Sequence, residues 1–257
     1  MQATDLDLLT DAARRSGRIA AGYFGQNPQI WDKPDDAGPV TAADLAVNTM
    51  LQDSLRAARP DYGWLSEETE DDTTRLSKDT IFVVDPIDGT RAFINGSKDW
   101  SHALAVVHQG QVTAAAVYLP MRDAMFTATL GGGAYLNGAP ITPSACADLS
   151  QASVLTHKAN CAGKYWKSGA SPDMKLGFRS SLAYRLCLVA NGDFDAMMTL
   201  RPTWEWDVAA GTLIVTEAGG RASTQRGDAV KFNNPHPQLD GLVAAGDTHD
   251  TLLSLLA

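Results

Sequence analysis

Apolar residues at helical spacing predict two amphipathic helices near the start of the chain. The first spans residues from about 4 to 24, where Thr4 can cap its start and Gly25 can end it. The second is expected to start near Thr41, and Pro60 lies beyond its end. The inner faces consist of Leu6, Leu9, Ala13, Ile19, Ala20 and Tyr23 in the first helix, and of Val47, Leu51 and Leu55 in the second.

Short apolar runs in the middle of the chain predict strands. The run from Ile81 to Val84 is mostly β-branched and indicates a buried strand. Three further runs follow at 103–107, 112–119 and 124–128, and turn residues such as Gln109-Gly110 separate them. Connections this short favour antiparallel pairing over parallel crossovers, which need a dozen or more residues. The middle of the chain is therefore expected to form an antiparallel sheet.

The second half of the chain mixes both patterns. Helices are predicted from Ser181 to Ala190 and from Asp207 to Ala218, where Gly219-Gly220 is a strong helix-end signal. The remaining expected elements are strands at 194–198 and 242–245 and a short helix after Asp250. Helices and strands in this order indicate an α+β fold built in layers. A division near residue 150, into halves 1–150 and 151–257, is compatible with the pattern, although no composition shift marks it.

Composition narrows the class of protein. The chain has 257 residues, of which 44% are hydrophobic and 20% charged, as is ordinary for a globular protein. Its formal charge of −9 disfavours a nucleic-acid polymer as partner. A small anion remains compatible, because bound cations can reverse the field inside a pocket. The odd number of cysteines, the acidic start and the lack of a long apolar run favour a cytoplasmic location without a membrane span.

The run from Asp85 to Thr90 carries the strongest chemical signal. Asp85 follows the buried-strand pattern, and Asp88 lies three residues later in a turn with Pro86 and Gly89. Backbone N–H groups at residues 89–91 could face an anion, since Thr90 begins a new segment. Two carboxylates beside such a turn suit a metal-bound phosphate. The alternative interpretation is a solvated turn that uses Asp and Gly for turn chemistry alone.

A covalent phosphatase mechanism is disfavoured by the spacing of these acids. Enzymes that form an aspartyl-phosphate use D-x-D-x-T after a strand, whereas Pro86 and Ile87 here separate Asp85 from Asp88. Histidines offer no alternative centre, because none has metal-ligand spacing or a nucleophile partner. The histidines interpreted as structural or surface residues are His102, His108, His157, His236 and His249.

Three other acidic segments each have a plain structural explanation. Glu67-Glu68 can be a solvated face, because unpaired acids are mostly exposed. Thr41-x-x-Asp44 before an apolar run is a capping-box pattern. Asp207 after Trp206 is an acidic residue at a predicted helix start, where the helix dipole favours it. Taken singly, each of these segments leaves its function open.

Taken in order, the four acidic segments resemble the signature of the inositol monophosphatase superfamily. The set is Thr41-x-x-Asp44, Glu67-Glu68, the 85–90 run and Trp206-Asp207-x-Ala-x-Gly. The resemblance extends from about Lys33 to Gly220 and implies a layered αβαβα sandwich of the kind shared with fructose-1,6-bisphosphatase. It places the site between an N-terminal half with most metal ligands and a C-terminal half with Asp207.

The resemblance also implies an Mg²⁺-dependent, lithium-sensitive phosphatase with two metal ions in each site. Glu67, Asp85 and the Ile87 carbonyl would hold the first ion, and Asp85, Asp88 and Asp207 the second, with Asp85 bridging. A third, weaker Mg²⁺ near Glu67 is also typical of the family. Hard oxygen ligands of this kind suit Mg²⁺.

Catalytic roles follow from the same resemblance. Two metal ions about 4 Å apart can activate water and stabilise the leaving oxygen. Glu67 and Thr90 would position the attacking water, and Asp44 would polarise the Thr90 hydroxyl. The expected substrate and phosphate contacts are Asp88, Gly89, Thr90 and Asp207, with backbone N–H groups acting at Gly89 and Thr90.

Two departures argue against an inositol substrate. Inositol monophosphatases usually continue the central motif as G-T-T-N-F, whereas this chain has Gly89-Thr90-Arg91-Ala92-Phe93. They also tend to carry a glutamate seven positions before the last aspartate, where it contacts an inositol hydroxyl. Leu200 occupies that position here and cannot accept a hydrogen bond.

Other motifs resemble bacterial 3′(2′),5′-bisphosphate nucleotidases of the CysQ type. The matching segments are Lys33-x-Asp35-Asp36, Ser180-Ser181-Leu182 and Pro202-Thr203-x-x-Trp206-Asp207. Ala183 replaces a lysine that is frequent in that family, so Arg185 or Arg201 would have to contact a second phosphate. Inositol-1-phosphate phosphatase, histidinol-phosphate phosphatase (which shares G-T-R-x-F-I) and a non-catalytic metal- or partner-binding module remain as alternatives. A small phosphorylated metabolite is the expected partner, and a homodimer would be common for the superfamily.

Overall fold

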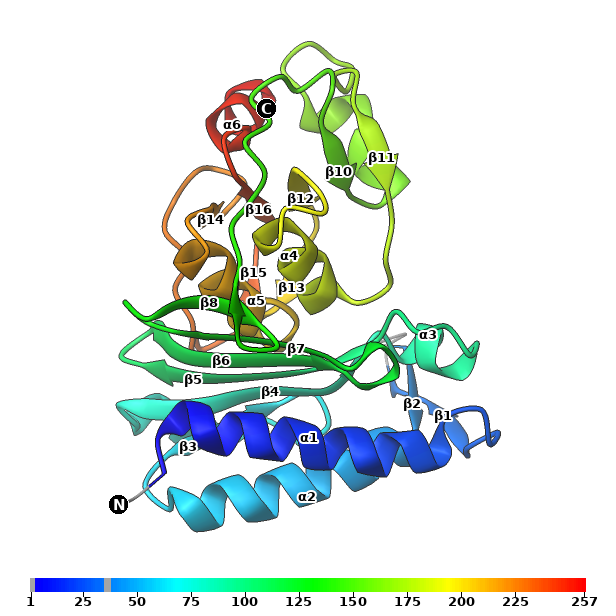
Figure 1. Cartoon of the computed structure of the whole chain (residues 1–257), viewed down its shortest axis with the longest axis vertical. Coiled ribbons are helices and arrows are strands. Elements are labelled where there is room, and N and C mark those ends of the chain that lie inside the picture. The colour runs from blue at the N-terminus through cyan, green and yellow to red at the C-terminus, as the bar shows by residue number, and fades with distance from the viewer. Residues whose placement is uncertain (1–2, 35–37) are drawn as a thin grey trace.

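The computed structural model describes residues 3–34 and 38–257 of the chain. It has five layers, in which helices and sheets alternate from α1 and α2 at one side to α6 at the other (Figure 1). This arrangement confirms the α+β class and the layered αβαβα sandwich. The pair Asp35-Asp36, part of one predicted motif, lies outside the described residues. In the described part of the chain, no helix is long and apolar enough to cross a membrane.

The larger sheet has seven strands in the order β3-β4-β5-β6-β7-β8-β9. Their bounds are β3 Gly63–Ser66, β4 Thr80–Asp88, β5 Ser101–His108, β6 Gln111–Leu119, β7 Ala124–Thr129, β8 Gly133–Leu136 and β9 Ala139–Pro140. Only β3 and β4 pair in parallel, and the other neighbours are antiparallel. The antiparallel sheet predicted for the middle of the chain is therefore confirmed.

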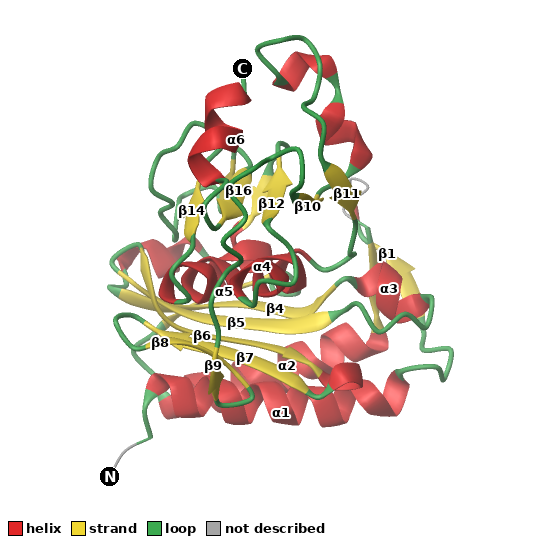
Figure 2. Ribbon diagram, turned by 45° about the horizontal axis from the view of Figure 1, so that its top comes forward, coloured by secondary structure: helices red, strands yellow, loops and turns green. Residues whose placement is uncertain are grey.

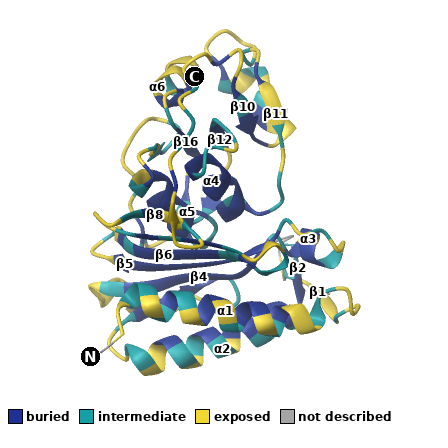
Figure 3. Ribbon diagram, in the orientation of Figure 1, coloured by how far each residue is buried: buried dark blue, intermediate teal, exposed yellow. Residues whose placement is uncertain are grey.

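Helices α1 (Asp5–Tyr23) and α2 (Ala42–Ala58) cover one face of this sheet (Figure 2). Capping boxes formed by Thr4 with Asp7 and by Thr41 with Asp44 fix their first turns. The predicted inner residues Leu9, Leu51 and Leu55 are buried against the sheet. The outer faces of both helices reach solvent, as their amphipathic pattern requires (Figure 3). The hairpin β1 (Ile30–Asp32) and β2 (Pro39–Thr41) leads into α2.

Helices α4 (Leu182–Ala190) and α5 (Glu205–Glu217) cover the opposite face of the sheet. Both are buried on nearly all sides, because the second sheet covers them in turn (Figure 3). Gly211 permits the close approach of α5 to α4, since a Cβ there would lie 2.5 Å from a Leu186 methyl carbon. Helix α5 begins at Glu205, two residues before the predicted start at Asp207.

The smaller sheet has five strands in the order β11-β10-β12-β16-β14. Its strands are β10 Ser153–Leu155, β11 Lys175–Gly177, β12 Ala196–Thr199, β14 Arg221–Ser223 and β16 Leu242–Ala245. The remaining elements are α3 Thr90–Ile94, the pair β13 Thr203–Trp204 and β15 Gln238–Leu239, α6 His249–Leu255, and 3₁₀ turns at Thr73–Ser77, Pro120–Arg122, Lys158–Cys161 and Gly163–Tyr165. All strands of the larger sheet precede those of the smaller one, while the division near residue 150 stays a prediction.

Strand β4 differs from the sequence interpretation at its functional end. Asp85 was expected to follow the strand and Asp88 to lie in a turn, but the strand continues through Asp88. Its register with β5 shifts between Asp85 and Asp88, so the intervening Pro86 lies in a bulge that needs no backbone donor. The ring of buried His102 on β5 bonds the Pro86 carbonyl and supports this bulge.

A buried arginine connects the larger sheet to helix α5. Arg75 is 1% exposed, and its guanidinium donates to the Asp71 carboxylate at 2.7 and 2.8 Å. It also donates to the Asn233 side chain at 2.6 Å and to the Asn234 carbonyl at 2.9 Å. Both asparagines in turn donate to the buried Glu205 carboxylate at the start of α5. Arg75 thus connects the larger sheet to the helix that carries Asp207.

Replacing Arg75 with methionine should destabilise the protein. The change leaves Asn233 and Asp71 without their donors, which is expected to lower the free energy of unfolding by about 2–4 kcal/mol. Urea unfolding followed by circular dichroism measures the loss. Arg221→Met is the matched control, since its 2.5 Å pair with Asp250 is exposed on both sides and should contribute little. Equal losses in the two variants would contradict the role of Arg75.

Candidate functional site

Three carboxylates from separate elements meet at the end of β4. Glu67 follows β3, Asp85 lies in β4, and Asp207 lies in the first turn of α5. One oxygen from each lies within 4.8 Å of the others. Asp85 is 1% exposed, and its Oδ1 has no hydrogen-bond partner among the described residues. A buried carboxylate oxygen without a donor is unfavourable unless a cation faces it.

The protonation of these acids reflects their mutual repulsion. Burial and the carboxylates of Glu67, Asp88 and Asp207 raise the pKa of Asp85 well above its ordinary value. Burial and the carboxylates of Asp88 and Glu67 likewise raise the pKa of Asp207. A divalent cation would relieve this repulsion, and carboxylate oxygens are the ligands that Mg²⁺ prefers. The residues present therefore fit a metal site.

Asp88 faces the same cavity but is held by helix α4. Its oxygens accept hydrogen bonds from the Ser181 hydroxyl at 2.6 Å, from Leu182 N at 3.2 Å and from Ala183 N at 2.7 Å. Burial raises the pKa of Asp88 to about 6, although these bonds lower it. A carboxylate at a helix N-terminus is also favoured by the helix dipole. Asp88 therefore fixes α4 against the site.

Gly89 turns the chain from β4 into α3. Its φ of 99° lies in the left-handed region, which favours glycine. A Cβ at this position would lie 3.1 Å from the Asp99 carbonyl and 3.3 Å from Ser181 N. Space and conformation both require glycine here, so the backbone of Gly89 and Thr90 is presented to the cavity.

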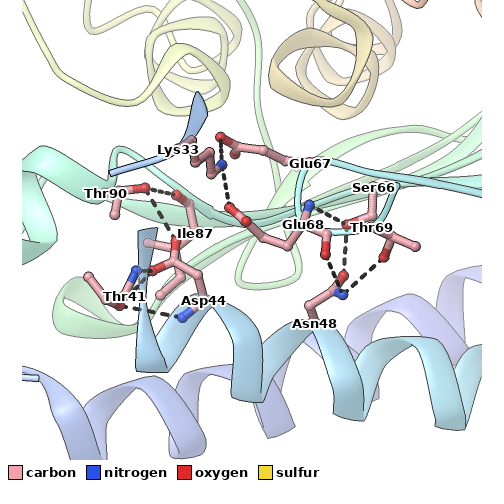
Figure 4. A network of polar contacts seen from close by, with 10 residues as sticks. All are labelled: Lys33, Thr41, Asp44, Asn48, Ser66, Glu67, Glu68, Thr69, Ile87 and Thr90. Atoms are coloured by element: carbon pink, nitrogen blue, oxygen red, sulfur yellow. Dashed lines mark hydrogen bonds and ion pairs between the residues drawn. The ribbon is translucent and has the colours of Figure 1, made fainter. Parts of the chain in front are cut away.

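Thr90 and Asp44 contact each other, as the family resemblance implies (Figure 4). The Thr90 hydroxyl is 3.3 Å from Asp44 Oδ1 and 3.2 Å from the Ile87 carbonyl. The other oxygen of Asp44 accepts from the Thr41 backbone at 2.8 Å, so one residue caps α2 and contacts Thr90. Burial raises the pKa of Asp44 to about 6, against the effect of the Thr41 bonds.

Lys33 joins the two adjacent glutamates (Figure 4). Its ammonium lies 2.6 Å from Glu67 Oε1 and 2.6 Å from Glu68 Oε1. Although burial alone would lower the pKa of Lys33, the two carboxylates raise it above its ordinary value. Burial and Glu67 raise the pKa of Glu68 to about 7. The Glu68 side chain is only 5% exposed, so the solvated-face interpretation is wrong for it.

The structure brings together every residue predicted for the site. They are Asp44, Glu67, Asp85, Ile87, Asp88, Gly89, Thr90 and Asp207, and most of them line one cavity of about 320 Å³. Leu200 is instead buried in the apolar cluster of the smaller sheet. The sequence interpretation missed the contacts of Lys33 and the bond from Ser181 to Asp88. A serine before the apolar run of α4 is a capping signal that could have indicated the latter.

A five-layer fold with buried acids where its layers meet defines a class of metal-dependent phosphatases. The chain belongs to the inositol monophosphatase family, whose sequence model matches residues 1–257. Over 253 residues it is 32% identical to an inositol-1-monophosphatase of Rhizobium meliloti, covering 95% of this chain and 92% of that one. It is 31% identical to a histidinol-phosphatase of Chlorobaculum parvum, covering 87% and 86%. The structure resembles the Thermotoga maritima IMPase with a TM-score of 0.80 at 27% identity, covering 95% and 93%.

These relationships establish the reaction class of the protein. Members of the family are phosphatases that act on phosphate monoesters and generally depend on Mg²⁺. The names of the relatives refer to different substrates, so membership in the family does not identify the leaving group of the ester. The closer resemblance to bisphosphate nucleotidases stays a prediction.

Neutralising Asp85 should stabilise the metal-free protein at neutral and higher pH. A carboxyl group whose pKa is raised by folding binds its proton more tightly when folded, so stability falls as pH rises through that interval. In EDTA at pH 8, Asp85→Asn is expected to melt about 3 °C or more above wild type. The difference should shrink as the pH is lowered through the raised pKa of Asp85, where the wild-type carboxyl group becomes protonated. Differential scanning calorimetry across this range measures it.

Saturating Mg²⁺ should reverse the order of the two proteins. Metal binding stabilises only the wild-type site to its full extent, because the variant lacks one carboxylate. Asp53→Asn, at an exposed position of α2, is the control and should track wild type at every pH. A wild-type protein that melts above Asp85→Asn in EDTA at pH 8 would contradict the repulsion.

Proposed function

We propose that the protein hydrolyses a small phosphate monoester with Mg²⁺, and that a 3′(2′),5′-bisphosphate nucleotide is its substrate. The reaction rests on the group formed by Glu67, Asp85 and Asp207, in which a buried Asp85 oxygen lacks any donor. Such a group is unfavourable on its own and suits a bound divalent cation. It opens into a cavity large enough for a phosphate group.

The ligand assignment follows the family resemblance, and the grouping of Glu67, Asp85 and Asp207 supports it. Glu67, Asp85 and the Ile87 carbonyl would hold one Mg²⁺, and Asp85, Asp88 and Asp207 would hold a second, with a weaker third near Glu67. When bound, Mg²⁺ supplies a Lewis acid for the phosphate oxygens and lowers the pKa of water. All other steps belong to the residues of the chain.

Those residues position the attacking water and the phosphate and polarise the Thr90 hydroxyl. Glu67 and Thr90 orient the attacking water, whose oxygen bonds to phosphorus while the ester P–O bond breaks. Asp44 accepts from the Thr90 hydroxyl and so leaves the threonine oxygen free to accept from water. The N–H groups of Gly89 and Thr90 bind phosphate oxygens, and Asp88 and Asp207 face the substrate. The attacking water releases a proton, the leaving oxygen takes up a proton, and the products are an alcohol and inorganic phosphate.

The choice of substrate rests on the surroundings of the acids. Leu200 is buried and offers no acceptor for a sugar hydroxyl, which weakens the inositol alternative. Arg185 and Arg201 line a cavity that adjoins the carboxylates, which favours a second anionic group. Inositol 1-phosphate and histidinol phosphate remain as alternatives because relatives bear those names. A non-catalytic metal- or partner-binding module is the least favoured, since no carboxylate of the set is missing.

Replacing Asp88 with asparagine should abolish turnover without unfolding the protein. The amide keeps the shape and can still accept a bond from α4, but it removes a metal charge. We expect Mg²⁺-dependent kcat/KM to fall about 100-fold or more, measured by phosphate release. Circular dichroism confirms the fold, and Asp207→Asn provides a second variant that does not contact α4 through the same bonds. Near wild-type turnover in both would contradict the metal site.

A panel of three phosphate esters tests the substrate. We expect adenosine 3′,5′-bisphosphate to give a higher kcat/KM than inositol 1-phosphate or histidinol phosphate, with each rate lost in EDTA and reduced by Li⁺. A preference for inositol 1-phosphate or histidinol phosphate would overturn the nucleotidase assignment while keeping the phosphatase. Absence of Mg²⁺-dependent release from all three, and from a wider set of monoesters, would favour a binding module.

A further inference from the structure

A second cavity adjoins the carboxylate cavity, and most of its lining residues come from the C-terminal half of the chain. It measures about 390 Å³ and shares Arg91, Phe178, Ser180, Leu182 and Asp207 with the first. Beyond this shared wall it is lined by Arg185 and Arg201, and we name it the arginine cavity. Among its described lining residues Asp207 is the only acid, and it lies on the shared wall. The two cavities thus adjoin each other but differ in the charge of their linings.

Arg185 is a buried cation without a counter-ion in contact. It lies on α4 and is 5% exposed, and no carboxylate of the described residues is within 4.0 Å of its nitrogens. Nε donates to the Arg179 carbonyl at 2.6 Å, which leaves the two terminal nitrogens without partners among the described residues. The guanidinium stacks on the Phe178 ring, with its carbon 4.5 Å from the ring centroid. One edge of the guanidinium is therefore held in place while the other faces the cavity.

Burying such a group is costly unless something pairs with it. Burial, together with the charge of Arg201, lowers the pKa of Arg185 to about 10, so the side chain is still charged at neutral pH. Asp88 and Asp207 oppose this shift from a distance, without a direct bond to the guanidinium. Metal ions at those carboxylates would cancel that distant support. The need for an anion in the arginine cavity would then be greatest when the metal site is filled.

We propose that the arginine cavity binds a second anionic group, carried by the same substrate molecule whose phosphate lies at the carboxylates. This inference rests on the proposed function and adds the residue that binds the leaving group, Arg185. Arg185 makes a paired contact through its two free nitrogens, a geometry that suits phosphate or carboxylate oxygens. Arg91 and Arg201, both exposed, add charge at the rim.

Charge also separates the competing substrates. Inositol 1-phosphate has an uncharged leaving group, which leaves the guanidinium of Arg185 unpaired. Histidinol phosphate carries an ammonium group, which three guanidinium groups around one cavity would repel. A substrate with anionic groups at both ends satisfies both cavities at once.

Matched substrate pairs test the subsite. Adenosine 3′,5′-bisphosphate and adenosine 3′-phosphate share the same 3′-phosphate and differ only in the second one. For a carboxylate as second group, 3-phosphoglycerate and sn-glycerol 3-phosphate form the equivalent pair. The measured quantity is the ratio of kcat/KM within each pair, and the pair with the larger ratio identifies the anion.

We expect Arg185→Met to lower the ratio of the preferred pair about tenfold or more, the scale of a lost charge-assisted hydrogen bond. The fall should come from a higher KM for the doubly anionic substrate. Arg185→Lys keeps the charge but loses the planar pair of N–H donors, so its kcat/KM ratio should lie between those of Arg185→Met and wild type. Arg56→Met, on the far side of the larger sheet, is the control and should leave the ratio as in wild type.

Other outcomes separate the subsite from the phosphatase activity. If Arg185→Met slows both members of a pair equally, the arginine only balances the charge of the carboxylates, and the subsite is overturned while the proposed function stands. If Arg185→Met fails to fold, Arg201→Met takes its place in the same comparison. If wild type hydrolyses no ester, calorimetric titration with adenosine 5′-phosphate still decides: binding about tenfold weaker in Arg185→Met or Arg185→Lys supports the subsite, and equal binding overturns it.

Discussion

Repulsion among Glu67, Asp85, Asp88 and Asp207 is the interaction that the rest of the structure must hold in check. Folding removes these charges from water and brings them close together, which costs free energy. Other contacts in the fold must offset that cost. The bulge in β4, where the His102 ring bonds the Pro86 carbonyl, fixes the position of the adjacent Asp85. On the opposite side, α5 is anchored by Glu205 and its asparagines, and the apolar core between the two sheets holds this helix in place. The framework is therefore stiff where the acids are most strained.

Much of the fold could be predicted because its helices and strands bury simple periodic faces. The capping boxes at Thr4 and Thr41 and the apolar runs of β5, β6 and β7 are local signals that packing did not override. The end of β4 was misjudged because Pro86 is a turn residue by local preference. Pairing of Asp88 with Ser101, a contact between distant positions, extends the strand instead. Likewise, the start of α5 is set by Glu205 and the Asn233 loop, which no local pattern reveals.

The site was predictable to the extent that residue order carries it. Spacing within the 85–90 run indicates two acids, but only the resemblance to a family adds Glu67 and Asp207 from other segments. Side-chain pairs between distant segments could not be predicted from the sequence. The adjacent glutamates were interpreted as solvated, yet Lys33 forms ion pairs with both of them in the fold. The burial of Arg185 could not be predicted either, since the sequence alone does not distinguish a buried arginine from an exposed one. Burial is a property of the assembled layers rather than of the segment.

Helix α4 has one further consequence for the proposed site. Its first turn is bonded to Asp88, while Arg185 extends from the same helix about one turn later, roughly 4.5 Å along the axis from Leu182. In the proposed site, the backbone bonds to Asp88 and the arginine of the proposed subsite thus lie within about one turn of a single helix. Under this proposal, a substitution at position 185 would change which leaving groups bind without removing the bonds that hold Asp88. Catalysis and the choice of substrate would then depend on different positions of the same helix.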